Sequence, residues 1–140
     1  MSEVGLRKAI VRRYYDEMWN RWDLSLAEGL LAPDLRFRGS LGTVAEGIGW
    51  FCRYARGVWQ GFPDFHNEIV EMVAEGDVVV ARLVFSGTHR GEVLGVAATG
   101  RRVRYEGIAW IRIEGALIAE VIVMADWEEL LRQIKVLDDD

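Results

Sequence analysis

The feature that most constrains this fold is a change in the spacing of apolar residues, which occurs after Phe65. Before that residue the apolar positions recur every three or four residues, as on one face of a helix. From His66 to Ala125 they recur at a period near two, which is typical of strands. Helices followed by a run of strands are typical of the α+β class. We therefore expect N-terminal α-helices packed on one face of a curved, mainly antiparallel β-sheet.

Turn residues give the expected bounds of these elements. Glu75-Gly76 and Gly115 mark the tight turns of two hairpins, whose four strands form an antiparallel meander. The long loop from Arg90 to Gly100 separates the two hairpins. The expected helices are residues 2–22, about 24–31, about 48–60 and 126–136, and the expected strands are residues 35–38, 66–74, 77–88, 101–114 and 117–125.

Composition limits the classes of function that remain. The 140 residues carry a formal net charge of −5 and no block of Lys or Arg, which argues against nucleic acid and against a membrane surface as partners. A chain of this length is expected to form one domain, residues 1–140, with a frayed tail at 138–140. The single cysteine, Cys52, cannot form a disulfide within the chain, and the N-terminal segment does not resemble a signal peptide. We expect a cytoplasmic protein.

The sequence lacks the motifs of several common chemistries. It contains no G-x-S-x-G, P-loop, C-x-x-C or H-E-x-x-H motif and no dinucleotide-binding fingerprint. Only His66, His89 and Cys52 are soft metal ligands, and none stands at paired spacing, so no metal site is expected. What remains is acid–base chemistry by a few polar side chains in an apolar pocket.

Strand phase brings two polar residues into apolar series. His89 continues the strand face that carries Phe85, and Asp126 continues the face of the last strand that carries Ile122 and Met124. Asp126 is therefore a candidate catalytic acid or base at the mouth or floor of a pocket. The alternative is that it only caps the final helix. His89 is a candidate catalytic partner that orients a substrate carbonyl or the Asp126 carboxylate. The alternative is a structural histidine that closes the strand end by bonding a loop carbonyl.

Aromatic residues are frequent for a chain of this length, which has six Trp, four Tyr and five Phe. Rings in a small protein usually belong to the core, but aromatic walls with a few polar points also form small-molecule pockets. The residues that we predict to contact a substrate are Tyr14, Trp19, Phe37, Trp50, Tyr54, Trp59, Phe85 and Met124.

One strand face mixes large apolar side chains with charges. Ile108 and Trp110 lie beside Arg104, Glu106 and Arg112 in the third of the four long strands. Large apolar groups among charges are typical of a subunit interface rather than of open surface. We expect a homodimer that forms through this outer face of the sheet.

A series of short motifs occurs between Gly61 and Gln133 in a distinctive order and spacing. They are Phe62-Pro63-Asp64, Ala74-Glu75-Gly76-Asp77-Val78-Val79, Gly87-Thr88-His89-Arg90-Gly91, Gly95, Thr99-Gly100-Arg101, Ile118-Ala119-Glu120, Asp126 and Gln133. In this order they resemble the SnoaL-like polyketide cyclase family, which belongs to the cone-shaped α+β folds named for nuclear transport factor two. The resemblance implies a cone-like barrel.

The resemblance also implies an activity. Members of this family close a ring on an aromatic polyketide ester by intramolecular aldol condensation, without metal or cofactor. Their acid–base aspartate lies at the end of the final strand, a position that Asp126 matches. By resemblance we expect a cofactor-independent cyclase or isomerase that acts on a small hydrophobic carbonyl compound, with the loop 91–100 as a gate. The alternatives are a non-catalytic domain that binds small hydrophobic ligands, a cofactor-free hydroxylase or epoxide hydrolase on the same fold, and a dimerisation module with a filled cone.

Overall fold

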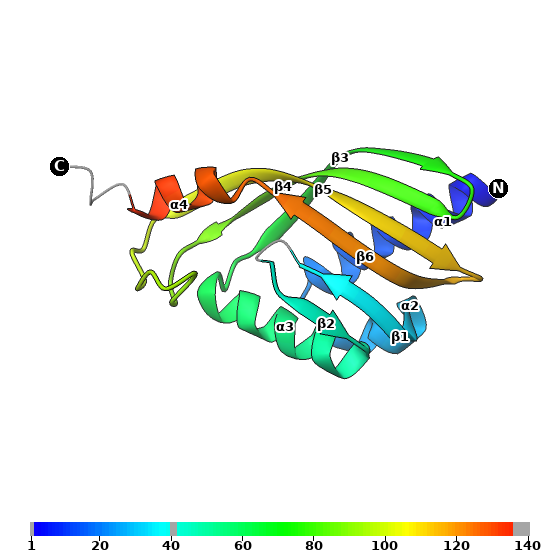
Figure 1. Ribbon diagram of the computed structural model, residues 1–140, viewed down its shortest axis with the longest axis horizontal. Coiled ribbons are helices and arrows are strands. Elements are labelled where there is room, and N and C mark those ends of the chain that lie inside the picture. The colour runs from blue at the N-terminus through cyan, green and yellow to red at the C-terminus, as the bar shows by residue number, and fades with distance from the viewer. Residues whose placement is uncertain (1, 40–41, 136–140) are drawn as a thin grey trace.

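The structure is a computed structural model that describes residues 2–39 and 42–135, so the tail expected at 138–140 lies outside it. Figure 1 shows the arrangement of the elements. The helices are α1 (Glu3–Arg13), the π-helix η1 (Tyr14–Trp19), the 3-10 turn η2 (Leu24–Leu26), α2 (Ala27–Leu30), α3 (Ile48–Gly61) and α4 (Trp127–Lys135). The strands are β1 (Leu31–Arg38), β2 (Val44–Glu46), β3 (His66–Glu75), β4 (Val78–Thr88), β5 (Arg102–Glu114) and β6 (Leu117–Ala125).

The strands form one sheet in the order β2-β1-β6-β5-β4-β3. The expected meander from β3 to β6 is confirmed, because each of these strands pairs antiparallel with the next. β1 extends the sheet by pairing in parallel with β6, and the short strand β2 pairs antiparallel with β1. β1 begins at Leu31, earlier than expected, because Leu31 pairs with Ile118. A pairing between such distant residues leaves no local sequence pattern.

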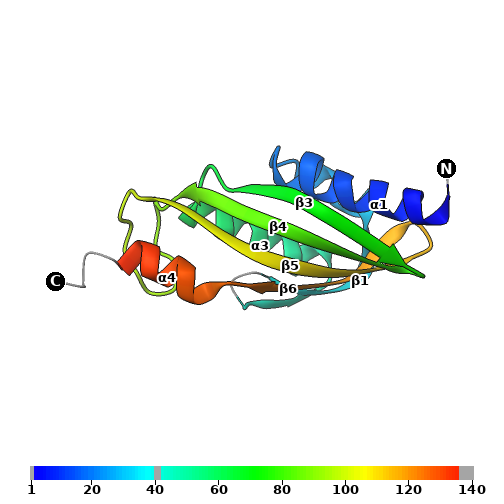
Figure 2. The ribbon, with the colours of Figure 1, turned by 90° about the horizontal axis from the view of Figure 1, so that it is seen from above.

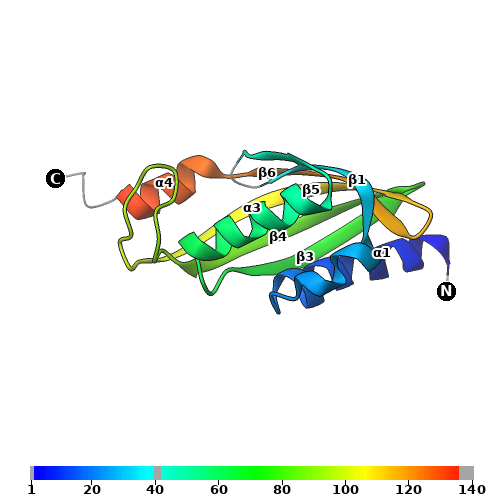
Figure 3. The same cartoon turned by 90° about the horizontal axis from the view of Figure 1, so that it is seen from below.

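The sheet is curved, and two helices cover its inner face. Figures 2 and 3 show α1 and α3 on the same side of the sheet, while the opposite face of β3, β4 and β5 carries no helix over its middle. On α3 the side chains of Phe51, Ala55 and Val58 are buried, whereas Arg53 and Arg56 are exposed. The expected α+β arrangement, with N-terminal helices on one sheet face, is confirmed.

The first helix changes from α to π at Tyr14, although the sequence pattern predicts a single regular helix over 2–22. Within the π segment the backbone N–H of Asn20 donates to the carbonyl of Tyr15 at 2.9 Å, a spacing of five residues. Tyr14 and Tyr15, the first two residues of this segment, are almost completely buried, at 1% and 2% exposure. Such π segments are frequent at functional sites.

A β-bulge in β6 reverses the expected facing of the second half of that strand. Successive residues of β5 pair with Glu120 and Ile118, so Ala119 is an extra residue without a partner. The extra residue shifts the alternation by one position. Met124 therefore lies on the outer face, where 70% of it is exposed. Asp126 shares this face with Met124, as the strand phase predicts, but the face is the outer one, so neither side chain points into the interior.

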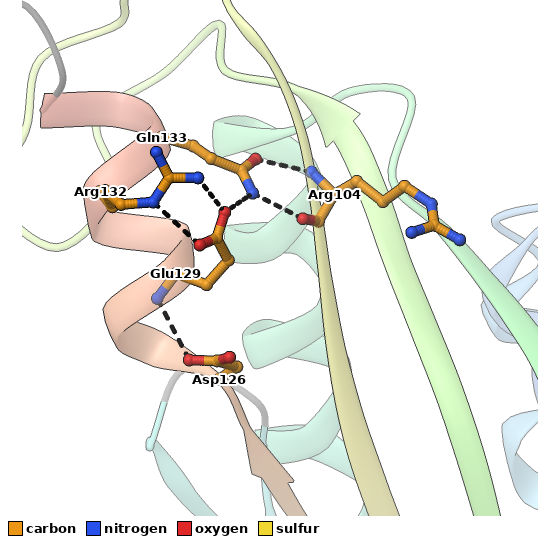
Figure 4. Close-up of polar contacts among 5 residues, drawn as sticks. All are labelled: Arg104, Asp126, Glu129, Arg132 and Gln133. Atoms are coloured by element: carbon orange, nitrogen blue, oxygen red, sulfur yellow. Dashed lines mark hydrogen bonds and ion pairs between the residues drawn. The ribbon is translucent and has the colours of Figure 1, made fainter.

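Side-chain amides complete the backbone hydrogen bonding at two places where a strand lacks a neighbour. At the edge strand β3, the Asn20 amide donates to the carbonyl of Asn67 and accepts from its N–H, both at 2.8 Å. At β5, Gln133 of α4 donates to the carbonyl of Arg104 at 2.7 Å and accepts from its N–H at 2.8 Å (Figure 4). Each amide imitates the peptide group of a missing strand.

Asp64 joins the end of α3 to the end of β4. Its carboxylate accepts hydrogen bonds from the backbone N–H of Thr88 at 2.6 Å and from the Thr88 hydroxyl at 2.7 Å, and it pairs with Arg102 at 3.4 Å. Burial by itself raises the pKa of the Asp64 carboxyl, but the bonds from Thr88 and the charge of Arg102 outweigh burial and hold this pKa below its ordinary value.

We expect Asp64→Asn to lower the free energy of unfolding by about 1 kcal/mol at pH 7, because charge-assisted bonds to a half-exposed group are lost. The folded pKa of Asp64 lies below the unfolded value of about 3.9. Its stabilisation is thus present above pH 4 and is lost as the pH falls through the folded pKa. Urea denaturation at pH 7 and pH 3 should show a difference that shrinks at pH 3, with exposed Asp34→Asn as the control. An equal difference at both pH values would contradict this account.

Candidate functional site

A small cavity lies between η1, α3 and the concave face of the sheet. Its volume is about 20 Å³, which is room for about one water molecule. Its walls are mostly aromatic rings, drawn from helix and sheet alike. The residues that line it are Tyr14, Tyr15, Trp19, Phe37, Tyr54, Val58, Phe65, Asn67, Phe85 and Val123.

The cavity brings together Tyr14, Trp19, Phe37, Tyr54 and Phe85, which the sequence pattern assigns to a pocket. The rings contact one another directly: Phe37 packs against Tyr54 with 5.0 Å between ring centroids, and Trp19 meets Tyr54 edge-on at 6.4 Å. Edge-to-face and tilted ring pairs of this kind contribute beyond the apolar area that they bury. The wall is therefore held by contacts among its own members.

Two glycines allow these rings to approach the sheet. A Cβ atom at Gly39, the residue after β1, would overlap the hydroxyl oxygen and ring carbon Cζ of Tyr54. A Cβ atom at Gly107 of β5 would lie 2.6 Å from Cε2 of Phe85. Both contacts are closer than a Cβ atom can approach another heavy atom. Each ring therefore occupies the space that the side chain of any other residue type would fill. These glycines serve close packing rather than a turn.

The polar groups of the cavity are uncharged. Burial raises the pKa of the Tyr14 and Tyr15 phenols, and the neighbouring tyrosines raise both pKa values further. Phenols with a raised pKa stay protonated at neutral pH and act as hydrogen-bond donors and acceptors. Asn67, at 3% exposure, adds a neutral carboxamide. The described lining residues include no carboxylate and no cation. This environment suits a neutral, apolar ligand that carries a few polar atoms.

Trp59 lies one layer outside the cavity, behind Trp19. Its ring packs edge-on against Trp19 at 5.9 Å and stacks on Trp22 at 4.8 Å with an interplanar angle of 19°. Trp22 has a φ of 57°, in the left-handed region that bulky residues rarely adopt, and 40% of it is exposed. Trp59 therefore supports the cavity wall instead of forming it.

Asp126 lies at the N-terminus of α4 and does not line the cavity. Its side chain is exposed, and Oδ1 accepts a hydrogen bond from the backbone N–H of Glu129 at 3.1 Å (Figure 4). This is the geometry of an N-cap. The cap that the alternative requires is present, whereas the choice between a cap alone and a catalytic role stays a prediction. The bulge at Ala119 is the reason that Asp126 faces outward.

Glu129, in the first turn of α4, is held as an anion. Arg132 donates to its two carboxylate oxygens at 2.9 and 2.6 Å, and Gln133 donates to one of them at 2.5 Å. The hydrogen bonds from Arg132 and then from Gln133 lower the pKa of Glu129 to about 2. Its negative charge near the helix N-terminus is favourable to α4.

His89 follows β4 and is completely buried. Its Nδ1 accepts from the backbone N–H of Thr99 at 3.3 Å and bonds the Thr99 hydroxyl at 2.9 Å, which ties the 90–100 loop to the sheet. The closure of the strand end thus uses an amide and a hydroxyl rather than the expected carbonyl. An Nδ1 that accepts places the ring proton of neutral histidine on Nε2, and no described residue hydrogen-bonds to this buried atom. His89 does not line the cavity, so its catalytic role also stays a prediction.

Two residues expected to contact a substrate lie on the surface instead. Trp50 is 59% exposed on the outward face of α3, where the guanidinium carbon of Arg53 lies 4.5 Å from its ring centroid. Trp50 directly precedes the buried Phe51, about 100° around the helix, and therefore lies outside the buried face of α3 although its ring is apolar. Met124 faces outward because of the bulge in β6. Neither residue lines the cavity.

The sequence pattern does not assign Tyr15, Val58, Phe65, Asn67 or Val123 to the site. Tyr15 shares a helix face with Val11 and Met18 and could have been found from helical spacing, whereas Val123 reaches the site through the bulge, which has no reliable signal in one sequence. Asn67 is different, because it stands two residues after Phe65 and so shares its strand face. That signal was available. Val58 belongs to the buried face of α3 and could have been found from helical spacing.

Within residues 2–39 and 42–135 no group of three or more His, Cys, Asp or Glu side chains is placed to hold a metal ion. None of the helices in the same two segments combines the length and the apolar character needed to cross a membrane.

We expect Gly39→Ala to lower the free energy of unfolding by about 1–3 kcal/mol, because the new methyl group displaces the ring of Tyr54. Gly57→Ala is the matched control, since nothing lies within 4 Å of a Cβ atom at this exposed helical position. It should be neutral or stabilising by up to about 1 kcal/mol. Chemical denaturation followed by tryptophan fluorescence measures both. Equal stability of the Gly39→Ala variant and the parent protein would show that Tyr54 is not fixed by this contact.

Comparison with known proteins identifies a family and solved structures that are similar to this chain. The family model for SnoaL-like polyketide cyclases matches residues 9–134. No curated protein sequence gives a significant match. A solved structure of a candidate SnoaL-like polyketide cyclase from Jannaschia sp. CCS1 superposes with a TM-score of 0.87 at 22% identity, covering 96% of this chain and 95% of that one.

Two further solved structures are similar at higher identity. TsrD from Streptomyces laurentii has a TM-score of 0.84 at 27% identity and covers 96% of this chain and 98% of its own. AclR from Streptomyces galilaeus, a candidate hydroxylase, has a TM-score of 0.82 at 28% identity and covers 99% and 86%. The expected cone-like α+β fold is thereby confirmed. Because the family model spans nearly the whole chain, the chain belongs to the SnoaL-like polyketide cyclase family.

Proposed function

We propose that the chain is a cofactor-independent enzyme that acts on a small hydrophobic carbonyl compound, by an intramolecular aldol-type ring closure or a related isomerisation. The observation that supports this best is the aromatic cavity, whose polar groups are buried phenols and a carboxamide. Such a site binds a neutral molecule and orients its oxygen atoms. Membership of a polyketide cyclase family favours ring closure among the reactions of carbonyl compounds. Because the cavity holds about one water molecule, binding requires its rings to move apart.

In the proposed mechanism Asp126 is the general acid and base. The cap bond uses Oδ1, and no described residue donates a hydrogen bond to Oδ2. Val123, three residues earlier, lines the cavity, whereas Asp126 faces outward, so the mechanism requires the end of β6 to turn Asp126 toward the bound ligand. The carboxylate removes an α-proton, and the enolate carbon attacks a carbonyl carbon of the same molecule. The new alkoxide then takes the proton back. In this mechanism His89 is a neutral hydrogen-bond donor, through Nε2, that orients the substrate carbonyl or the Asp126 carboxylate.

Asp126→Asn separates catalysis from capping, because asparagine also provides a side-chain oxygen to the helix N-terminus. We expect the free energy of unfolding to change by less than about 0.5 kcal/mol. The probe is 2-tetralone, an apolar aromatic ketone whose α-protons exchange in D₂O. The protein-dependent exchange rate, followed by proton NMR, should fall at least about 100-fold.

Asp23→Asn is the matched control, because Asp23 caps η2 through a bond from the N–H of Ser25 at 3.2 Å. It should leave the exchange rate unchanged. An Asp126→Asn variant that exchanges 2-tetralone at the parental rate would show that Asp126 only caps α4.

Three other functions remain as alternatives. The exposure of Asp126 and its use as a cap favour a non-catalytic domain that binds small hydrophobic ligands. A protein that binds 2-tetralone without accelerating its exchange supports that alternative. The similarity to AclR at 28% identity favours a cofactor-free hydroxylase, and an epoxide hydrolase on this fold would use the same cavity.

We further propose that two copies of the chain pair through the outer face of the sheet. Ile108, Trp110 and Met124 expose 52%, 47% and 70% of their surface, and Ile108 is the cross-strand partner of Met124. Arg82 and Glu106 form an ion pair at 3.2 Å on this face. Apolar side chains with a charged rim are typical of subunit interfaces.

Trp110→Glu should convert the proposed dimer to a monomer, because it places a charge within the apolar contact. Sedimentation equilibrium at micromolar concentration measures the mass. Val44→Glu is the control, since Val44 is 68% exposed but lies on β2, away from this patch. A monomeric mass for the unchanged protein would overturn the dimer.

A further inference from the structure

Asn67 is a cavity residue with an unusual support. It is the second residue of β3, the edge strand, and its partner on β4 is Phe85. On its open side it has no neighbouring strand, and the side chain of Asn20 fills that place. Asn20 follows η1, so the contact also joins the π-helix to the sheet.

These contacts determine which way both carboxamides point. The backbone N–H of Asn67 requires an acceptor, and its carbonyl requires a donor, so Asn20 must present Oδ1 to the first and Nδ2 to the second. The same Oδ1 of Asn20 accepts a bond at 3.2 Å from the side chain of Asn67, which must therefore present Nδ2. A flipped Asn67 would bring two oxygens together. Both orientations follow from donor and acceptor chemistry.

The remaining atom of this pair is the side-chain Oδ1 of Asn67. No described residue donates a hydrogen bond to it, although the residue is 97% buried and lines the cavity. Among the described residues, the fully enclosed side-chain atoms without a hydrogen-bond partner include Nε1 of Trp19 but not Oδ1 of Asn67, so this oxygen is not sealed off and can accept a hydrogen bond from a ligand in the cavity. The tyrosine hydroxyls of the cavity both donate and accept, so they do not distinguish ligands in this way. The fixed oxygen of Asn67 does.

We propose that Asn67 makes the cavity selective for ligands that donate a hydrogen bond, namely phenols and enols, and that Asn20 is the positioning residue that keeps its oxygen available. This inference rests on the proposed function of the cavity as a ligand site, and it names the group that the ligand carries besides its carbonyl. Ethers and esters, which only accept, can bond to the tyrosine hydroxyls but not to this oxygen, and therefore bind less well.

The test compares two ligands that differ in one property. 2-Naphthol donates a hydrogen bond, whereas 2-methoxynaphthalene has the same rings and oxygen but cannot donate. Isothermal titration calorimetry at pH 7 should show that the unchanged protein binds 2-naphthol about tenfold more tightly, which corresponds to one hydrogen bond to a buried acceptor. In Asn67→Leu, which has a similar volume and no acceptor, this preference should disappear while 2-methoxynaphthalene still binds.

Variants of Asn20 test the positioning role. Asn20→Ala frees the Asn67 carboxamide to turn its Nδ2 toward the ligand, so 2-methoxynaphthalene should bind more tightly and the preference should fall severalfold. Asn20→Asp keeps an acceptor for both Asn67 donors and should retain the preference, although it loses the bond to the Asn67 carbonyl. A merely structural role of Asn20 would weaken both ligands equally. If Asn20→Ala does not fold, the comparison with Asn67→Leu still decides the role of Asn67.

The outcomes separate this inference from the proposed function. If both ligands bind the unchanged protein and Asn67→Leu with the same ratio, Asn67 does not select the ligand and the inference is overturned alone. If neither ligand binds the unchanged protein, the cavity is not a ligand site, and the proposed function fails together with the inference.

Discussion

The packing of aromatic rings around Trp19 is the interaction on which the rest of the structure depends. Trp19 projects from η1 and contacts Phe51 at 5.7 Å and Trp59 at 5.9 Å on α3, and Phe65 at 6.1 Å beside the start of β3. The indole of Trp19 thus joins η1 to α3 and to the residue that precedes β3. Flat, rigid rings that meet edge-on do not fill space completely, and the small cavity is what their contacts leave. The stability of the fold and the presence of a site have the same origin.

Local pattern predicts much of this fold and fails where the chain departs from regular geometry. The period-two stretch predicts the meander β3–β6, and the caps and glycines predict α3 and α4. The π turn at Tyr14, the bulge at Ala119 and the parallel pairing of β1 with β6 are not predicted, because each is fixed by partners distant in the sequence. A bulge of one residue is enough to turn Met124 and Asp126 from the inner to the outer face.

The residues of the candidate site likewise divide into those that local sequence pattern predicts and those that it does not. Rings such as Phe37 and Tyr54 were identifiable because aromatic residues on apolar faces meet wherever the faces meet. The position of Asp126 before the final helix likewise indicated a helix cap, as one of two interpretations of this residue. The role of Asn67 could not be predicted in this way. It depends on Asn20, which follows a different element and whose carboxamide fixes the direction of the Asn67 carboxamide. Polar specificity in this cavity is a property of pairs of residues, whereas its apolar character is a property of single ones.

The parallel pairing of β1 with β6 has a consequence for how the chain is made. Phe37, a wall of the cavity, pairs with Val121, so the ribosome must add 84 residues after Phe37 before its partner is present. At ribosomal rates this takes roughly 4 to 17 s, during which the apolar face of β1 has no strand beside it except β2. Long-range closure of this kind also slows folding. The cavity therefore cannot be complete before β6 has been made, because this strand supplies both the wall residue Val123 and the neighbour of Phe37.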